Sequence, residues 1–267
     1  MLRKRELEAY MKLLLMLVLS VLMPALSFAQ VHTQSIDYQQ NGTPLEGFVA
    51  YKEGLKGKVP GILVVPDWMG LGDHYKSIAA KLAELGYVAF VADIYGKGVK
   101  PANSQEAGAL AKKYKDDRKL MRDRVKAGLD RLRKFDNVDP NRVAAMGYCF
   151  GGTVVLELAR SGADILGVVS FHGGLATPTP QDAKNIKAHV LALHGADDPF
   201  VPPEEVAAFQ QEMRNGHVDW QMVIYGNAVH AFTTPAAGND KSKGAAYDEK
   251  ADKRSWEAMK AFFKELF

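Results

Sequence analysis

The stretch "AAMGYCFGGTVVLELA", residues 144–159, decides how the rest of the chain is interpreted. It begins as a short apolar run, passes through a glycine on each side of Cys149, and continues with apolar residues at helical spacing. This pattern predicts a buried strand, a tight turn and then a helix. Cys149 is the only cysteine in the chain and lies at the turn. It is therefore either a small core residue or a nucleophile.

Strand-like and helix-like segments alternate on both sides of this stretch. The strand-like segments are apolar along their whole length, which is typical of strands that are buried on both faces of a parallel sheet. The predicted strands are 45–51, 60–66, 87–95, 141–148, 165–173, 188–195 and 219–226. The predicted helices are 74–87, 104–135, 150–162, 202–216 and 247–267. The alternation predicts an α/β fold, with a mostly parallel central sheet and helices on both faces.

The N-terminal segment differs in composition from the rest of the chain. A basic stretch precedes the apolar run "LLLMLVLSVLMPALSFA", which is broken by Pro24 and ends in the small-x-small pattern of a cleavage site. We predict a signal peptide over 1–29, cleaved after Ala29, with Met11 as a possible true start. The alternative is an uncleaved membrane anchor. Cleavage predicts an exported protein, periplasmic or secreted and free of the membrane, with a single domain over 30–267.

The charge pattern bears on possible partners. The chain has 267 residues and a net charge of +3, and its basic residues are mixed with acidic ones, as in "KYKDDRKLMRDRVKAGLDRLRK". This mixture favours a solvated helix face over a patch that binds nucleic acid. The sequence shows no cluster with metal-ligand spacing and no glycine-rich phosphate loop after the first strand. We expect no nucleic-acid partner, no metal and no organic cofactor. The sequence does not define the oligomeric state, and a monomer is favoured.

Residues 147–151 have the pattern G-x-C-x-G between a predicted strand and a predicted helix. With serine at its centre, this pattern is the nucleophile elbow of α/β-hydrolases. The helix begins directly after Cys149, so its N-terminal amides and dipole face the sulfur and favour the reactive thiolate. The pattern alone does not exclude a buried cysteine in a glycine-rich turn.

An acid and a histidine follow Cys149 at the ends of later predicted strands. Asp198 comes after "HVLALHG", and His230 comes after "DWQMVIYG". The order nucleophile, acid, histidine is the order found in α/β-hydrolases. We predict that Cys149 attacks the substrate, that His230 takes and returns the proton, and that Asp198 orients the imidazole. Two long polar loops, 96–104 and 233–246, are expected to form walls of the site.

With these residues in place, the chain resembles the dienelactone hydrolase family of α/β-hydrolases. The resemblance covers the whole mature chain and includes "GYCFGG", "HGADDPFVP", "YGNAVHAFT" and "ADKRSWEAMKAFF". It implies an α/β-hydrolase fold and the hydrolysis of a carboxyl ester or lactone through an acyl-enzyme. It also implies that the acid is Asp198 rather than Asp197. An oxyanion hole needs two backbone N–H groups, and we expect them from Trp68 and Phe150.

The chain departs from this family at positions that bear on the substrate. The family has a glutamate before the second oxyanion donor, with the suggested role of contacting the resting cysteine; this chain has Asp67, which is one methylene shorter. Lys97 lies near one of the two arginines that hold the substrate carboxylate in dienelactone hydrolases. Thr234 occupies the region of the other and cannot form a bidentate carboxylate pair. A general ester or lactone hydrolase is therefore expected. Tyr148 and His172 are expected to line the site, although His172 is equally compatible with a structural role.

An interpretation from another class stays open. An exported protein with an α/β-hydrolase-like fold could bind a ligand in this site without turnover, and an unreactive Cys149 would favour that interpretation. The complete Cys-Asp-His set argues against it. A thiol redox protein is disfavoured, because the chain has no second cysteine to resolve a sulfenic acid.

Overall fold

The structure, a computed structural model, describes residues 3, 4, 6, 8, 11 and 30–267. The predicted signal peptide over 1–29 therefore lies almost wholly outside the described residues. Val31–Phe267 form one compact unit. Within the described residues, no helix is both long and apolar enough to cross a membrane.

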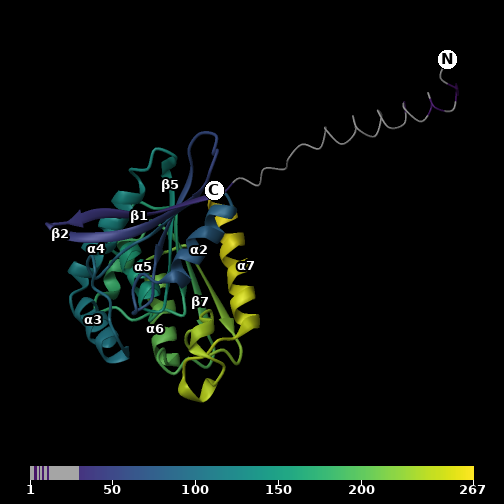
Figure 1. The fold of residues 1–267 in the computed structure, drawn as a ribbon. Coiled ribbons are helices and arrows are strands. Elements are labelled where there is room, and N and C mark those ends of the chain that lie inside the picture. The colour runs from purple at the N-terminus through teal and green to yellow at the C-terminus, as the bar shows by residue number, and fades with distance from the viewer. Residues whose placement is uncertain (1–2, 5, 7, 9–10, 12–29) are drawn as a thin grey trace. The chain divides into compact units, whose positions relative to one another are not determined.

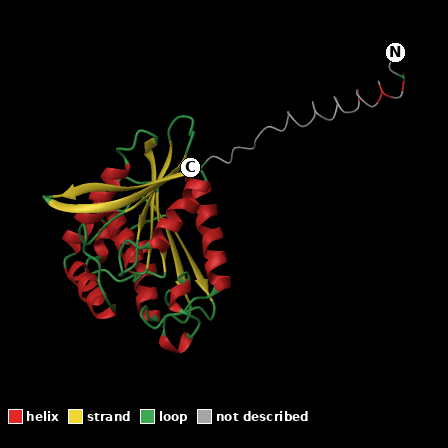
Figure 2. Ribbon diagram, in the orientation of Figure 1, coloured by secondary structure: helices red, strands yellow, loops and turns green. Residues whose placement is uncertain are grey.

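An eight-stranded sheet runs through this unit (Figures 1 and 2). Its strands are β1 (Val31–Gln40), β2 (Thr43–Lys52), β3 (Val59–Val65), β4 (Val88–Val91), β5 (Val138–Tyr148), β6 (Gly167–Phe171), β7 (His189–Gly195) and β8 (Trp220–Tyr225). The strand order is β1-β2-β4-β3-β5-β6-β7-β8. The pairs β1–β2 and β2–β4 are antiparallel, and every other pair is parallel. The predicted mostly parallel sheet is confirmed.

Helices cover both faces of the sheet (Figure 1). One face carries α3 (Ser104–Asp116), α4 (Arg118–Leu132), α5 (Phe150–Arg160) and α6 (Pro203–Asn215), and the other carries α2 (Asp73–Glu84) and α7 (Glu249–Leu266). Residues of β3 alternate between the two cores: Leu63 packs with the first group of helices, and Ile62 and Val64 pack with the second. All three are fully buried. Burial on both faces explains why the strands are continuously apolar.

Two details of the predicted elements differ from the structure. The sequence analysis misses β1, an edge strand that pairs only with β2 and leaves many of its polar side chains in solvent. The long helix predicted over 104–135 is wrong, because it is divided into α3 and α4 at Asp117. The Asp117 carboxylate accepts the N–H of Leu120 at 2.9 Å and caps α4. Aspartate is favoured at this capping position because it satisfies a free N–H group of the first turn.

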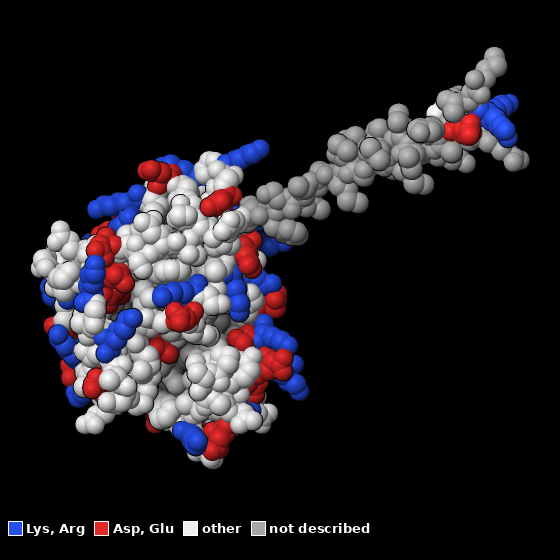
Figure 3. Space-filling view, viewed as in Figure 1, with Lys and Arg blue, Asp and Glu red and all other residues white. Residues whose placement is uncertain are grey.

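Charged side chains of both signs are interspersed on the face seen in Figure 3. Several lysines pair with a carboxylate one helical turn away. The pairs are Lys112–Asp116, Lys119–Asp123 and Lys253–Glu249. These exposed i,i+4 pairs are the solvated helix faces that the charge pattern predicts, and each stabilises its helix by a few tenths of a kcal/mol.

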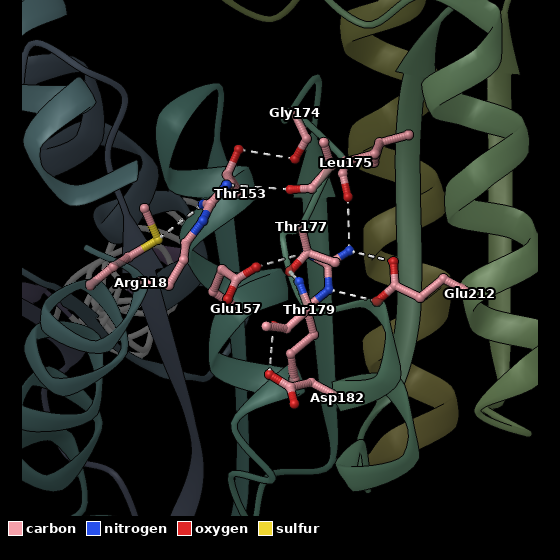
Figure 4. A network of polar contacts seen from close by, with 12 residues as sticks. Arg118, Thr153, Glu157, Gly174, Leu175, Thr177, Thr179, Asp182 and Glu212 are labelled. Atoms are coloured by element: carbon pink, nitrogen blue, oxygen red, sulfur yellow. Dashed lines mark hydrogen bonds and ion pairs between the residues drawn. The ribbon is translucent and has the colours of Figure 1, made fainter. Parts of the chain in front are cut away.

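A buried ion-pair network ties α5 to α6 and to the segment after β6 (Figure 4). Arg160, fully buried, binds both carboxylate oxygens of Glu212 at 2.8 and 2.7 Å and one oxygen of Glu157 at 3.1 Å. Arg122 binds Glu157 and Asp182, each at 2.7 Å. Every one of these carboxylates has a guanidinium partner, so the network is closed.

Candidate active site

Cys149 lies at the turn between β5 and α5. Its backbone has φ 54° and ψ −115°, in a region that non-glycine residues rarely adopt. Gly147 and Gly151 make this turn possible: a Cβ on either residue would lie within 2.2 Å of a backbone oxygen, that of Gly151 or that of Val65. The strained turn is the geometry of a nucleophile elbow, in which the central side chain is exposed above the sheet edge.

The ends of β5, β7 and β8 place three polar side chains in line. His230 Nε2 lies 3.0 Å from Cys149 Sγ, and His230 Nδ1 lies 2.8 Å from Asp198 Oδ2. The N–H of Phe200 donates to the other carboxylate oxygen of Asp198 at 2.9 Å, which fixes the orientation of the carboxylate. Asp198 is 4% exposed, whereas Asp197 is exposed. The structure thus brings together the three residues that the sequence singled out.

His230 favours its protonated form. Burial lowers the pKa of its imidazole, but the hydrogen bonds and negative charges of Asp198 and Cys149 outweigh burial and raise the pKa to about 10. An imidazolium 3.0 Å from the sulfur stabilises a thiolate. The N-terminus of α5, which begins directly after Cys149, adds a second stabilising contribution. The geometry therefore places an imidazolium and the N-terminus of α5 next to the sulfur of Cys149.

The backbone N–H groups of Trp68 and Phe150 donate to no other group among residues 30–267. Both are thus available to an oxyanion. Tyr95, which the sequence analysis missed, contacts both of these residues. Its hydroxyl donates to the carbonyl oxygen of Trp68 at 2.9 Å, and its ring stacks on that of Phe150 with centroids 5.7 Å apart. The available signal was the position of Tyr95 just beyond the end of a parallel strand.

Asp67 forms the turn that presents Trp68. Its carboxylate accepts the N–H of Met69 at 2.8 Å, and its carbonyl oxygen accepts the N–H of Gly70 at 3.0 Å. No hydrogen bond joins Asp67 to Cys149 in the described part of the chain. Burial raises the pKa of the Asp67 carboxyl above its usual range. The Asp67 carboxylate therefore stabilises the turn of its own loop through the bond to Met69.

Tyr75 is a second residue that the sequence analysis missed. Burial raises the pKa of its phenol well above 10, and the negative charges of Asp67 and Cys149 raise it further. Tyr75 therefore stays neutral at this position. No periodic signal distinguishes it from the other apolar positions of α2, where it is one of the buried residues.

A cavity of about 60 Å³ opens beside Asp67 and Phe150. Loop 96–104 contributes Val99 and Lys100 to its walls. Lys97, the predicted substrate cation, is not among the lining residues. Its ammonium group instead lies 2.5 Å from a carboxylate oxygen of Asp37 and 3.8 Å from one of Glu46, and so ties the β1–β2 hairpin to this loop. The cations that reach the cavity are those of Lys76 and Lys100.

Tyr148 and His172 are both buried, close to Cys149 and His230. The ring of Tyr148 stacks on that of Phe171 with centroids 4.5 Å apart, and so stabilises the end of β5 that leads into the turn at Cys149. His172 is 1% exposed, and its ring centroid lies 5.2 Å from that of His230. Among the described residues, no group of three or more His, Cys, Asp or Glu side chains could hold a metal ion.

Known proteins share this architecture. Residues 45–267 match the dienelactone hydrolase family. A solved structure, described as the dienelactone hydrolase-like promiscuous phosphotriesterase P91 from metagenomic libraries, is 43% identical with a TM-score of 0.85, covering 89% of this chain and 99% of that one. Protein usf of Aquifex pyrophilus is 30% identical over 236 residues, 87% of this chain and 98% of that protein. A putative carboxymethylenebutenolidase of Aquifex aeolicus is 29% identical over 235 residues, 86% and 97% of the two chains.

The chain belongs to the dienelactone hydrolase family and has an α/β-hydrolase fold. Both the resemblance and the fold predicted from the sequence are confirmed. The family match also confirms the prediction of an enzyme of the ester and lactone hydrolase class.

Proposed function

We propose that this protein hydrolyses carboxyl esters or lactones through a covalent acyl-enzyme on Cys149. The observation that carries the proposal is the continuous array from Cys149 Sγ through His230 to Asp198, with contacts of 3.0 and 2.8 Å. The two free backbone N–H groups of Trp68 and Phe150 supply what the array lacks, a site for a developing oxyanion.

The first half of the reaction forms the acyl-enzyme. The thiolate of Cys149 attacks the carbonyl carbon of the substrate. The carbonyl oxygen becomes an oxyanion, which accepts hydrogen bonds from the N–H groups of Trp68 and Phe150. The tetrahedral intermediate then collapses: the carbon–oxygen bond to the alcohol breaks, and the imidazolium of His230 donates its proton to the leaving oxygen. A thioester on Cys149 and a neutral His230 result.

The second half restores the resting pair. Neutral His230 accepts a proton from water, whose oxygen attacks the thioester carbonyl. The carbon–sulfur bond breaks, the thiolate leaves, and the acid product releases its own proton to solvent. Asp198 stays ionised throughout and holds the imidazole through Nδ1, 2.8 Å from Oδ2. His230 ends protonated and Cys149 ends as a thiolate, so the cycle balances.

The expected substrate is a general ester or lactone. Lys97 is engaged by Asp37 and Glu46, and Thr234 replaces a family cation, so neither residue offers an arginine-like clamp for a substrate carboxylate. Lys76 and Lys100 reach the neighbouring cavity as single point charges. We propose that a substrate carboxylate is tolerated and not required.

A substrate panel tests this proposal. The mature protein is assayed with p-nitrophenyl acetate and with esters and lactones that differ in one carboxylate near the scissile bond; a phosphotriester is added because of the activity named for P91. We expect turnover of the esters, with less than a tenfold preference for the carboxylate forms. Cys149→Ala should lose this activity, and full turnover by that variant would end the proposal. If iodoacetamide does not label Cys149 at neutral pH, a binding protein without turnover is favoured.

We also propose that the chain is exported, to the periplasm or beyond, after cleavage at Ala29. Support comes from the apolar run and the "SFA" pattern before Gln30. Protein recovered from the periplasm or medium of an expression host should begin at Gln30 by N-terminal sequencing. Recovery of the uncleaved chain in the membrane fraction would favour an anchor instead.

A further inference from the structure

His172 occupies an unfavourable position next to His230. It follows β6 with φ +39°, in the left-handed region that only a few per cent of non-glycine residues adopt. Its imidazole is almost fully buried, and Nδ1 has no hydrogen-bond partner in the described part of the chain. A strained backbone and a buried unpaired nitrogen both oppose folding. Their coincidence at one residue beside a reactive group indicates a functional requirement.

The contacts of His172 join the sheet to the loop that carries His230. The N–H of His172 donates to the carbonyl oxygen of Leu193 at 2.8 Å, which continues the ladder between β6 and β7. On the loop side, Nε2 lies 2.7 Å from Thr233 Oγ1. The imidazole ring also meets the rings of His230 and Phe232, with centroids 5.2 and 5.0 Å away and interplanar angles of 67° and 81°.

The loop around His230 needs such support. Asn227 and Ala231 both have positive φ, 62° and 57°, so the backbone is irregular on both sides of the histidine. The backbone of His230 bonds to Gly244 at 3.1 Å and to Ala246 at 3.0 Å. Both partners belong to the segment that follows in the same connection between β8 and α7. The His172–Thr233 contact instead reaches the rigid sheet.

We propose that His172 is a positioning residue, whose imidazole holds the ring of His230 in line with Cys149 through its edge contact and its bond to Thr233. This inference rests on the function proposed above for Cys149 and His230. Burial lowers the pKa of His172 well below 6.5, and the charge of His230 lowers it further. A neutral ring supports the neighbouring imidazolium without repelling it. The titratable groups whose charges act on His230, or on which it acts, are Cys149, Asp198, Asp67, His172 and His194.

The first test is a pair of substitutions that remove the same contact from its two ends. His172→Asn keeps a residue that tolerates positive φ, and Thr233→Val keeps the size of the side chain. We expect each to lower kcat about tenfold with KM within about twofold, and the double variant to be no worse than His172→Asn alone, because both changes remove one bond. Thr153→Val is the matched control, since it removes another hydroxyl bond to the segment after β6, 3.0 Å to the carbonyl oxygen of Gly174, that does not involve the loop around His230.

The second test does not need ester turnover. The rate at which iodoacetamide alkylates Cys149 is followed against pH, because that rate reports the thiolate. In His172→Asn and Thr233→Val the rate at neutral pH should fall and its rise should move to higher pH, while Thr153→Val should follow the wild type. A wild-type kcat and a wild-type alkylation profile in both variants would overturn the inference. So would losses that parallel the melting temperature across all three variants. Failure of the proposed function has a different signature, full turnover by Cys149→Ala.

Discussion

The two ends of α5 carry polar groups that are organised in opposite ways. At its N-terminus, Cys149 has a strained backbone, and the donors of Trp68 and Phe150 have no partner among the described residues. At its C-terminus, Arg160 uses Nε, Nη1 and Nη2 on carboxylate oxygens and one carbonyl oxygen. The helix dipole favours an anion at the first end and a cation at the second. A closed network stabilises the fold, whereas donors without a partner among residues 30–267, beside the strained Cys149, are suited to bind a reacting group.

The most damaging substitution should be one beside the N-terminal end of α5. Asp198→Asn removes the charge that holds the imidazolium of His230, and we expect kcat/KM for p-nitrophenyl acetate to fall by about 10³- to 10⁴-fold. The melting temperature should change little, because the side chain keeps its size. Steady-state kinetics and thermal unfolding of the same sample check both statements. A loss below tenfold would remove Asp198 from the mechanism and return attention to Asp197.

Disrupting the ion-pair network at the C-terminal end of α5 should lower stability and leave kcat unchanged. Arg160→Met leaves Glu212 buried without a guanidinium partner and Glu157 with only that of Arg122, and the free energy of unfolding should fall by about 3–5 kcal/mol. Urea unfolding measures this change. The control is Lys119→Met, which breaks the pair with Asp123 at an exposed position and should lower stability by less than about 1 kcal/mol. If Arg160→Met instead lowers kcat of the folded protein, the two ends of α5 are coupled.

A smaller effect is expected at the loop after β3, which presents the N–H group of Trp68. Tyr95→Phe removes the hydroxyl that donates to Trp68 and keeps the ring that stacks on Phe150. We expect kcat to fall about five- to tenfold, corresponding to about 1 kcal/mol, with KM unchanged. Tyr247→Phe is the control, because that hydroxyl bonds Asp252 in a different part of the chain. Equal kinetics for the two variants would show that the hydroxyl of Tyr95 does not organise the donor.

The last prediction concerns the change of stability with pH. In the folded chain burial lowers the pKa of His230, but its bonds to Asp198 and Cys149 raise it overall from 6.5 to about 10. The resulting stabilisation is fully present below pH 6.5 and is lost as the pH rises through 10. Urea unfolding across this window should show the wild type losing stability relative to His230→Gln, which lacks the titrating group. A flat difference between the two proteins would argue against a raised pKa of His230.

Most of the fold and the central site residues could be predicted from the sequence. Buried parallel strands are continuously apolar, and the carboxyl ends of such strands meet at one edge of the sheet. That rule was enough to group Cys149, Asp198 and His230 before any distance was known. The break at Asp117 and the edge strand β1 were missed, because one depends on a single capping bond and the other lacks an apolar pattern.

The roles of the residues around Cys149, Asp198 and His230 could not be predicted from the sequence. Lys97 is 60 positions from Asp37, and only the return of the β1–β2 hairpin to the end of β4 pairs the two charges. Tyr95 and Tyr75 resemble ordinary core aromatics until their contacts are visible. Pairing and contact between distant segments depend on how strands stack in space, which a local pattern does not encode.

The layered α/β architecture, the glycine-bounded turn at Cys149 and the order of the acid and the histidine after it are all encoded locally in the chain. Local chemistry carries these features: small residues permit the turn, and apolar runs require burial. Three other features depend on long-range packing: His230 lies between Cys149 and Asp198, Tyr95 donates to the carbonyl oxygen of Trp68, and Lys97 pairs with Asp37. Distances, burial and the resulting pKa of His230 arise from segments brought together by folding, so they exist only in the folded chain.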